Sequence, residues 1–377
     1  MDYDLTEEQR ILQKSARDFL KKECPKALIR DLAENDEGHS PELWKKMADM
    51  GWMGLMLPEV YGGSGWTFQG LVLLLEEMGY NLCPGPFFAT TVLCAPAILD
   101  AGSESQKQDL LSAVSNGEEI LTLAWAEGTG GFDVASTEVT ATLEGDEWVI
   151  NGAKLFVPDA QIADHMLCVA GTQSESGSQA GVTLFLVPKN ASGLSCDPLK
   201  TVGWDKQYKV VFDQVRIPLA HVIGAPHGAG AGLVNVMEMA AVGRCAEMIG
   251  HAQAAMDMTI TYAKERVQFD RPIGSFQAVQ HRFADMWLDI HMSRNLVHRA
   301  AWKISQGMPA AGEAAMAKMR VGKTARKATQ IAHQLFGAIG FTMEHDLHLY
   351  HRRVLAGDMA FGNSDYQEEK VAKHLGL

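Results

Sequence analysis

One carboxylate, that of Glu247, stands out in an Ala- and Met-rich stretch that is predicted to form a long helix from Leu233 to the stop at Asp270-Arg271-Pro272. Small residues recur around it at steps of three and four and would share its helix face: Ala240, Gly243, Gly250 and Ala254. A second helix or a flat ligand can approach the backbone closely there, and Glu247 would meet it directly. A carboxylate with a pKa raised by desolvation can take a proton from a substrate.

The same spacing also fits a purely structural role. The small residues would then form a tight seam between two helices, and Glu247 would pair with Arg244, its neighbour one turn back. Taken alone, the pattern favours this interpretation. The choice between a structural seam and a functional site therefore depends on the elements that position the helix.

Composition and charge narrow the class of protein. The chain has 377 residues, of which 47% are hydrophobic and 21% charged, as expected of a globular protein. Its net charge of −13 indicates that it lacks the excess of basic residues typical of nucleic-acid-binding proteins. The acidic N-terminus MDYDLTEEQR is unlike a targeting peptide, and no apolar run reaches the length of a membrane span. The six cysteines show no C-x-x-C pair. We expect a cytoplasmic protein with reduced thiols and no membrane span.

Periodicity divides the chain into three regions and predicts an α+β fold. Residues 1–120 are predicted to be an N-terminal helical domain, with a capping box at Thr6–Gln9. In residues 121–225 apolar and polar residues alternate with a period of two, as in the hairpin predicted over Val139–Ile150. This region is predicted to form a middle β domain. Residues 226–377 return to helical spacing, and four long helices there predict a bundle. They are the helix around Glu247 and those at roughly 275–306, 310–337 and 347–375.

Three segments of the chain resemble the acyl-CoA dehydrogenase family. The segment Tyr262–His281 (YAKERVQFDRPIGSFQAVQH) is similar to the family's most recognisable sequence, Leu57–Gly65 to its P-E-x-Y-G-G-x-G loop, and Lys209–Pro218 to its V-x-F-x-x-V-x-V-P ending. The resemblance covers nearly the whole chain. It implies a helical domain, a β-barrel-like domain and a four-helix bundle, FAD as cofactor, and electron-transfer flavoprotein as electron acceptor.

A nucleotide-binding Rossmann unit is not expected, because the glycines at 228, 230 and 232 follow no strand. The resemblance implies instead an FAD that lies extended between the β domain and the bundle, with its pyrophosphate held by an arginine of a neighbouring subunit. A guanidinium suits a diphosphate because its charge is fixed and its donors form a fork. The positions that match the family's FAD-binding residues are Trp125, Ala126, Phe156, Arg266, Phe269, Gln277, Gln334 and Gly337.

Three of these flavin contacts depart from the family pattern. Ala338 replaces the second residue of a Gly-Gly pair, and Ala126 replaces the threonine of a T-E-P segment, so it offers only its backbone N–H. Pro158 replaces a hydroxyl residue that bonds the flavin ring. The same departures fit a subgroup of the family in which some chains bind FAD poorly and work only beside a second chain.

The usual catalytic base of the family is missing. Most members place a glutamate in an E-G-T motif, where this chain has Phe361-Gly362-Asn363, and a minority use the position of Ala240. Glu247 lies two turns beyond Ala240 on the same face, and its surroundings resemble relatives that act on branched or sterol-side-chain thioesters. We therefore predict Glu247 as the catalytic base, with Glu238 as its main rival and a chain without any base as the second alternative.

The polar cluster Glu344–His351 lacks H-E-x-x-H spacing, so no metal site is predicted. The leading hypothesis is an FAD-dependent enzyme that oxidises an acyl-CoA to its 2-enoyl-CoA and assembles as a homotetramer or as a heterotetramer with a related chain. The alternative is an inactive subunit that shapes a heteromeric complex. The missing E-G-T glutamate favours the alternative, whereas Glu247 and Arg266 oppose it.

Overall fold

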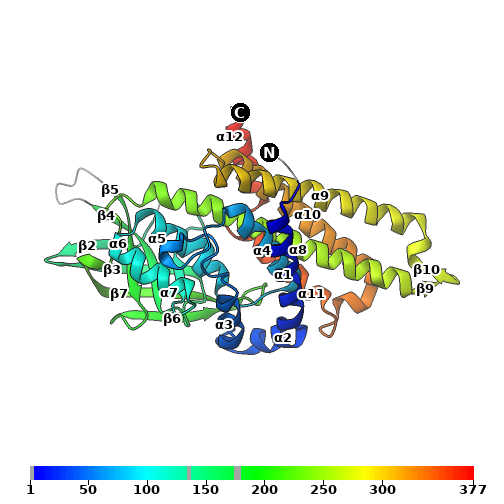
Figure 1. The fold of residues 1–377 in the computed structure, drawn as a ribbon, viewed down its shortest axis with the longest axis horizontal. Coiled ribbons are helices and arrows are strands. Elements are labelled where there is room, and N and C mark those ends of the chain that lie inside the picture. The colour runs from blue at the N-terminus through cyan, green and yellow to red at the C-terminus, as the bar shows by residue number, and fades with distance from the viewer. Residues whose placement is uncertain (1–3, 134–136, 174–179) are drawn as a thin grey trace.

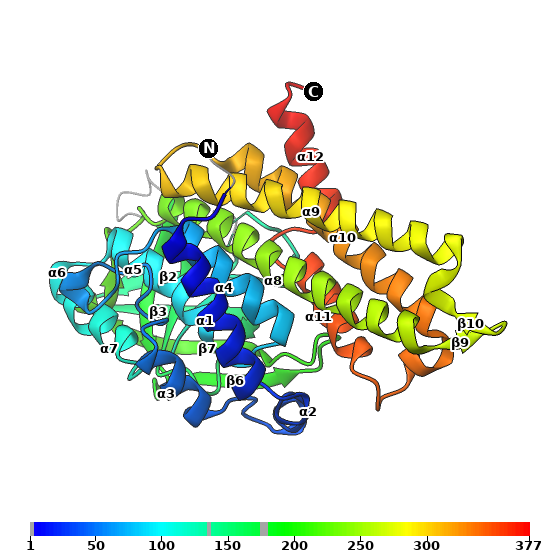
Figure 2. The ribbon, with the colours of Figure 1, turned by 45° about the vertical axis from the view of Figure 1, so that its right-hand side comes forward.

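The computed structural model describes residues 4–133, 137–173 and 180–377. A β-sheet lies at one end of the molecule, and the helices α8 (Gly230–Glu265), α9 (Gln277–Ser305) and α10 (Ala311–Phe336) extend from it to the opposite end (Figure 1). Turning the molecule shows α8 running through its middle, between the N-terminal helices and the rest of the bundle (Figure 2). The predicted order of helical, β and helical regions is confirmed.

The N-terminal region is built from short helices. Thr6 caps the first helix in the predicted capping box, with its side chain accepting from the Gln9 N–H at 3.2 Å. Ser40 caps another, which has Pro41 in its first turn. The elements are α1 (Glu7–Glu23), α2 (Lys26–Glu34), α3 (Pro41–Asp49), η1 (Glu59–Tyr61), α4 (Phe68–Asn81), η2 (Phe88–Cys94), α5 (Ala95–Ala101), α6 (Glu104–Gln106), η3 (Lys107–Leu111) and α7 (Ser112–Ser115).

The middle region is one mixed sheet with the strand order β6-β7-β3-β2-β4-β5-β8, and β1 pairs with β4 in parallel. The predicted hairpin is present, with Leu143 opposite Trp148. Over the residues that the structure describes, the strand path does not close on itself, so the barrel-like region is an open sheet. Its strands are β1 (Leu121–Ala124), β2 (Thr140–Glu144), β3 (Glu147–Pro158), β4 (His165–Gln173), β5 (Ala180–Pro188), β6 (Leu194–Leu199), β7 (Gln207–Pro218) and β8 (Val222–Ile223), with η4 (Leu219–His221) before β8.

The C-terminal region contains the predicted bundle of α8, α9, α10 and α11 (Leu347–Met359). Two predicted boundaries are wrong. Helix α8 ends at Glu265 rather than at Pro272, because the chain turns back in a short hairpin of β9 (Val267–Gln268) and β10 (Arg271–Pro272). The elements η5 (Ile273–Ser275) and η6 (Gly337–Phe341) complete the connections.

The last predicted helix is also interrupted. Instead of one helix over 347–375, α11 ends at Met359 and α12 (Ser364–His374) begins after a turn. Phe361 and Gly362 both adopt positive φ angles in that turn, 56° and 91°, and a helix cannot continue through such residues. The break places the Phe361 ring between the helical regions and the sheet.

One apolar core joins the three regions. It includes Leu74 of α4, Leu123 of β1, Leu167 of β4 and Ile249 of α8, all fully buried. A second core covers the other face of the sheet, around Trp148, Phe185 and Phe212. Because close-packed interiors resist deformation, the shared core fixes the sheet edge relative to α8.

Candidate active site

The small-residue face of α8 is a close helix–helix seam. Gly79 of α4 lies against the backbone of α8, and a Cβ atom on it would collide with the Glu247 carbonyl oxygen. Gly250 is the reciprocal position, since a Cβ there would collide with the Glu76 carbonyl oxygen. The structural interpretation of these glycines is therefore confirmed. The Glu247 side chain leaves the seam and pairs with Arg244, as that interpretation also predicted.

The Glu247 carboxylate is nearly enclosed, with 14% of its side-chain surface exposed, and its Oε2 lies 2.5 Å from Nη1 of Arg244. Burial raises the pKa of Glu247, and the positive charges of Arg244 and of Arg353 on α11 oppose this shift. The Arg244 Nε is buried without a hydrogen-bond partner in the described part of the chain. The carboxylate thus combines limited solvent access with a raised pKa, two properties that favour proton uptake.

A row of π contacts connects Arg244 with the edge of the sheet. The Arg244 guanidinium lies over the Phe88 ring at 4.0 Å from its centroid. Phe88 stacks on Phe361 at a centroid distance of 5.9 Å, and Phe361 stacks on Trp125 at 6.3 Å with nearly parallel planes. Each of the three regions contributes to this row. The sequence analysis did not predict a role for Phe88. The only nearby signal is the Pro-Gly-Pro turn at 84–86, which precedes the helical segment that contains Phe88.

Phe361 occupies the turn in which most members of the resembled family place their base. Its carbonyl accepts from Gln367 Nε2 at 2.9 Å, and a Cβ on Gly362 would lie too close to Gln367 and Tyr366. The turn is therefore held in a conformation that a non-glycine residue adopts only at a cost. A hydrophobic ring stands there instead of a carboxylate, so this turn supplies no proton acceptor.

Glu238 lines a cavity of about 240 Å³ next to this aromatic row. Burial raises its pKa, and Lys370 of α12 lowers it. Trp125 and Phe361 line the same cavity. Glu238 and Glu247 are thus both carboxylates with raised pKa values on α8.

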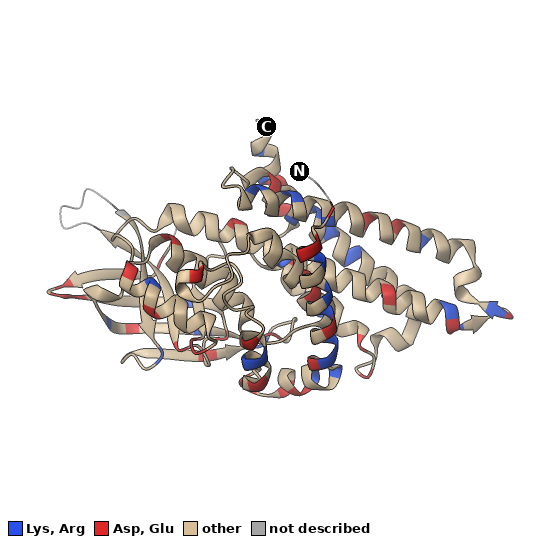
Figure 3. Cartoon of the chain, in the orientation of Figure 1, with Lys and Arg blue, Asp and Glu red and all other residues tan. Residues whose placement is uncertain are grey.

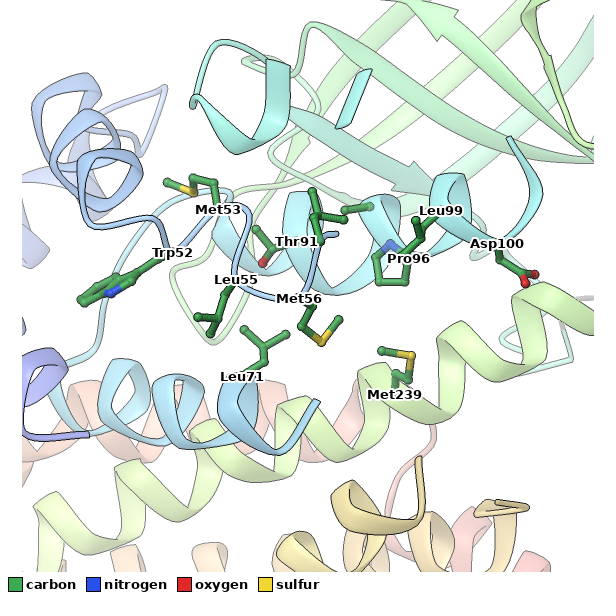
Figure 4. A pocket seen from close by; sticks show the side chains of 12 residues that line it. Trp52, Met53, Leu55, Met56, Leu71, Thr91, Pro96, Leu99, Asp100 and Met239 are labelled. Atoms are coloured by element: carbon green, nitrogen blue, oxygen red, sulfur yellow. The ribbon is translucent and has the colours of Figure 1, made fainter. Parts of the chain in front are cut away.

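A separate, largely apolar cavity of about 330 Å³ lies on another side of α8. Met239 contributes to it from α8, facing Leu71 of α4 and Leu99 of α5, with Asp100 at one end (Figure 4). Neither Glu238 nor Glu247 lines this cavity.

The predicted FAD-binding residues fall into two groups at opposite ends of the molecule. Trp125 and Ala126 follow β1, and Phe156 of β3 is beside them, since the Leu155 N–H donates to the Ala126 carbonyl at 2.8 Å. The Phe156 side chain is 58% exposed. This first group forms an open sheet edge that begins at the Trp125–Phe361 contact.

The second group lies around the β9–β10 hairpin. Tyr262 of α8 stacks on Phe336 of α10 at 4.4 Å, which brings the ends of the two helices together. The exposed positions near this contact are Arg266, Phe269, Gln277, Gln334 and Gly337. Arg266 comes 28 residues after Glu238 in α8, about 42 Å at 1.5 Å per residue. Because Trp125 lines the same cavity as Glu238, the two groups lie near opposite ends of α8.

The residues of both groups fit an FAD molecule. The first offers an exposed aromatic side chain beside the backbone of Ala126, as a flat ring system requires. The second offers the exposed guanidinium of Arg266, together with Gly337, where a Cβ would meet no atom within 4 Å and backbone can come close to a ligand. When bound, FAD would supply the acceptor for the hydride that leaves the substrate.

The described residues carry few other candidates for chemistry. They contain no group of three or more His, Cys, Asp or Glu side chains able to hold a metal ion. Lys and Arg are interspersed with Asp and Glu along the helices (Figure 3). Among the described helices, none combines the length and the apolar character needed to cross a membrane.

A helical bundle thus packs on a sheet edge whose exposed residues fit a flavin. Comparison with known families gives the assignment. The chain matches the acyl-CoA dehydrogenase N-terminal domain over residues 6–118, the middle domain over 122–215 and the C-terminal domain over 230–376. The chain belongs to the acyl-CoA dehydrogenase family, whose members are FAD-dependent oxidoreductases, as the resemblance predicted.

Similar proteins align over essentially the full length. The probable acyl-CoA dehydrogenase YngJ of Bacillus subtilis (strain 168) is 32% identical, with all of both chains covered. Butyryl-CoA dehydrogenase from Megasphaera elsdenii superposes with a TM-score of 0.91 at 27% identity, with all of both chains covered. A chain of the ChsE4-ChsE5 complex from Mycobacterium tuberculosis superposes with a TM-score of 0.91 at 26% identity, over 100% of this chain and 99% of that one.

Proposed function

We propose that this acyl-CoA dehydrogenase converts an acyl-CoA thioester to its 2-enoyl-CoA with Glu247 as the base, and that its electrons pass to an electron-transfer flavoprotein. The observation that carries the proposal is the continuous row from Glu247 through Arg244, Phe88 and Phe361 to Trp125. An enclosed carboxylate lies at one end of this row, and the sheet edge with the residues that we propose to bind flavin lies at the other.

The chemistry asked of Glu247 is the removal of the proton on the carbon next to the thioester carbonyl. Burial raises the pKa of Glu247 and so increases its affinity for that proton, and the positive charge of Arg244 opposes this rise. The Arg244–Glu247 ion pair at 2.5 Å also orients the carboxylate. A base displaced from the usual turn fits a branched or bulky acyl group, because the reacting carbons then lie away from Phe361.

We also propose that a complete FAD site needs two chains. About 42 Å of helix separates Glu238, which lines a cavity with Trp125 of the first group, from Arg266 of the second, so Arg266, Phe269 and their neighbours would serve the sheet edge of another subunit. A tetramer is typical of the family, and both a homotetramer and a heterotetramer satisfy this requirement.

The six cysteines are free thiols, which fits the cytoplasmic location that we propose.

A second function has its own supporting observations. With Phe361 in the usual base position and Ala126 and Pro158 in place of hydroxyl residues, the chain fits an inactive subunit that completes the FAD site of a related partner. The heteromeric ChsE4-ChsE5 complex is similar in structure. In this alternative Glu247 and Arg244 form only a structural ion pair.

The first experiment is the visible absorbance spectrum of the chain purified alone, with the FAD of a denatured extract quantified. The proposed enzyme contains close to one FAD per chain and is bleached by straight-chain or branched acyl-CoA substrates. A folded, colourless chain that gains flavin and activity only with a related chain, in a complex that stays active after Glu247→Gln, supports the alternative. Bound flavin that no acyl-CoA bleaches would contradict the dehydrogenase proposal.

A further inference from the structure

A buried ion pair lies directly behind the flavin-binding edge of the sheet. The Lys154 side chain on β3 is 0% exposed and that of Glu127 is 4% exposed, and Nζ lies 2.6 Å from Oε1. Withdrawing two charges from water is costly, and such a pair is often no more stabilising than apolar residues of similar volume. We therefore ask which backbone segments the pair holds in place, in addition to any contribution that it makes to stability.

Lys154 fixes both neighbours of Ala126. Besides Glu127, its Nζ donates to the Trp125 carbonyl at 3.1 Å and to Thr137 Oγ1 at 2.9 Å, so all three ammonium hydrogens are used. Between these two anchors, the Ala126 carbonyl accepts from the N–H of Leu155, the residue after Lys154. Three consecutive residues are thereby tied to one strand.

Glu127 is held equally firmly on its other side. Its Oε1 accepts from Thr137 Oγ1 at 2.6 Å and from the Val139 N–H at 3.0 Å, and its Oε2 accepts from the Glu138 N–H at 2.5 Å. Burial alone would raise the pKa of Glu127, but these bonds and the one from Lys154 outweigh it and lower the pKa. The carboxylate therefore stays ionised, and the network keeps its charge-assisted bonds.

We propose that the Lys154–Glu127 pair is a positioning device that fixes the backbone of Trp125–Glu127, so that the Ala126 N–H is pre-oriented toward the flavin ring. This inference depends on the FAD site proposed above. Ala126 has no side-chain donor and Pro158 has neither a hydroxyl nor an N–H, so little else at this edge can orient the ring. A single donor gives useful affinity only when its orientation is fixed before binding.

The test compares two ion pairs of the same sheet. In the double variant Lys154→Met/Glu127→Gln both charges are removed together, so that neither is left buried alone. Lys189→Met is the matched control, because Lys189 forms an exposed ion pair with Asp164 at 2.9 Å. Circular dichroism and thermal melting of the full-length chain establish folding, and quenching of flavin fluorescence gives the FAD dissociation constant.

We expect the folded double variant to bind FAD at least about tenfold more weakly, with a less resolved absorption spectrum of the bound flavin, and Lys189→Met to behave like the wild type. Thr137→Val, which removes one partner of each ionic group, should weaken binding about threefold and is decisive if the double variant does not fold. Equal FAD affinities for these variants and the wild type would overturn the inference alone. A wild type that takes up no FAD, alone or with a related chain, would overturn the proposed FAD site as well.

Discussion

Glu247→Gln is the substitution that separates a catalytic role of this residue from a structural one. Glutamine keeps an oxygen that can accept from Arg244, now 2.5 Å from the carboxylate. Because only 14% of the Glu247 side chain and 27% of the Arg244 side chain are exposed, the variant leaves a largely buried guanidinium without its counter-charge, and we expect it to fold but to lose about 3 kcal/mol of stability. Its FAD content should match that of the wild type.

The rate of flavin bleaching by acyl-CoA should respond much more strongly. Loss of a positioned base costs about 10² to 10⁴ in rate, or about 3 to 5 kcal/mol in the activation barrier. The wild-type rate should also rise with pH through the raised pKa of Glu247, since only the ionised carboxylate accepts a proton, and the variant should lack this limb of the profile.

The assay is anaerobic stopped-flow absorbance of the FAD-loaded protein, with Glu238→Gln measured in parallel. A Glu247→Gln variant that keeps its FAD and bleaches at the wild-type rate would refute the reasoning. If Glu238→Gln is the slow variant instead, the carboxylate in the 240 Å³ cavity is the base.

Three further predictions test the FAD site, the seam and a buried histidine. Arg266→Ala should reduce FAD retention by the assembled protein with little change in melting temperature, because the residue is exposed; unchanged retention would exclude it from the FAD site. Gly79→Ala should lose about 1 to 3 kcal/mol of stability in denaturant titration, because a Cβ would collide with the Glu247 backbone, whereas Gly131→Ala, where a Cβ meets nothing within 4 Å, serves as control; equal stability of the two would contradict the close seam. Burial lowers the pKa of His251 to about 3, so the folded state stays neutral while the unfolded chain takes up a proton, and stability should fall as pH drops from about 6.5 toward 3, by up to about 1.4 kcal/mol per pH unit. His251→Gln should flatten that dependence, and an unchanged slope would show that other groups cause it.

Local patterns predicted much of the fold. The capping box at Thr6, the hairpin around Gly145 and the helical spacing after residue 226 are confirmed because each depends on neighbours within a few residues. Predictions of boundaries failed where the backbone turns sharply. The end of α8 at Glu265 and the break at Phe361 depend on turn conformations that the spacing of apolar residues does not encode.

The sequence by itself determined the family, the order of the three regions and the isolation of Glu247 on a face of small residues, since motif spacing and periodicity are written in adjacent residues. Only the tertiary structure decided that this face is a seam against α4 and that Glu247 turns out of it to Arg244. Only it joined Phe88, Phe361 and Trp125 in one row and set Trp125 and Arg266 near opposite ends of α8. Contacts between residues far apart in the chain depend on how whole elements pack, and no local pattern specifies that packing.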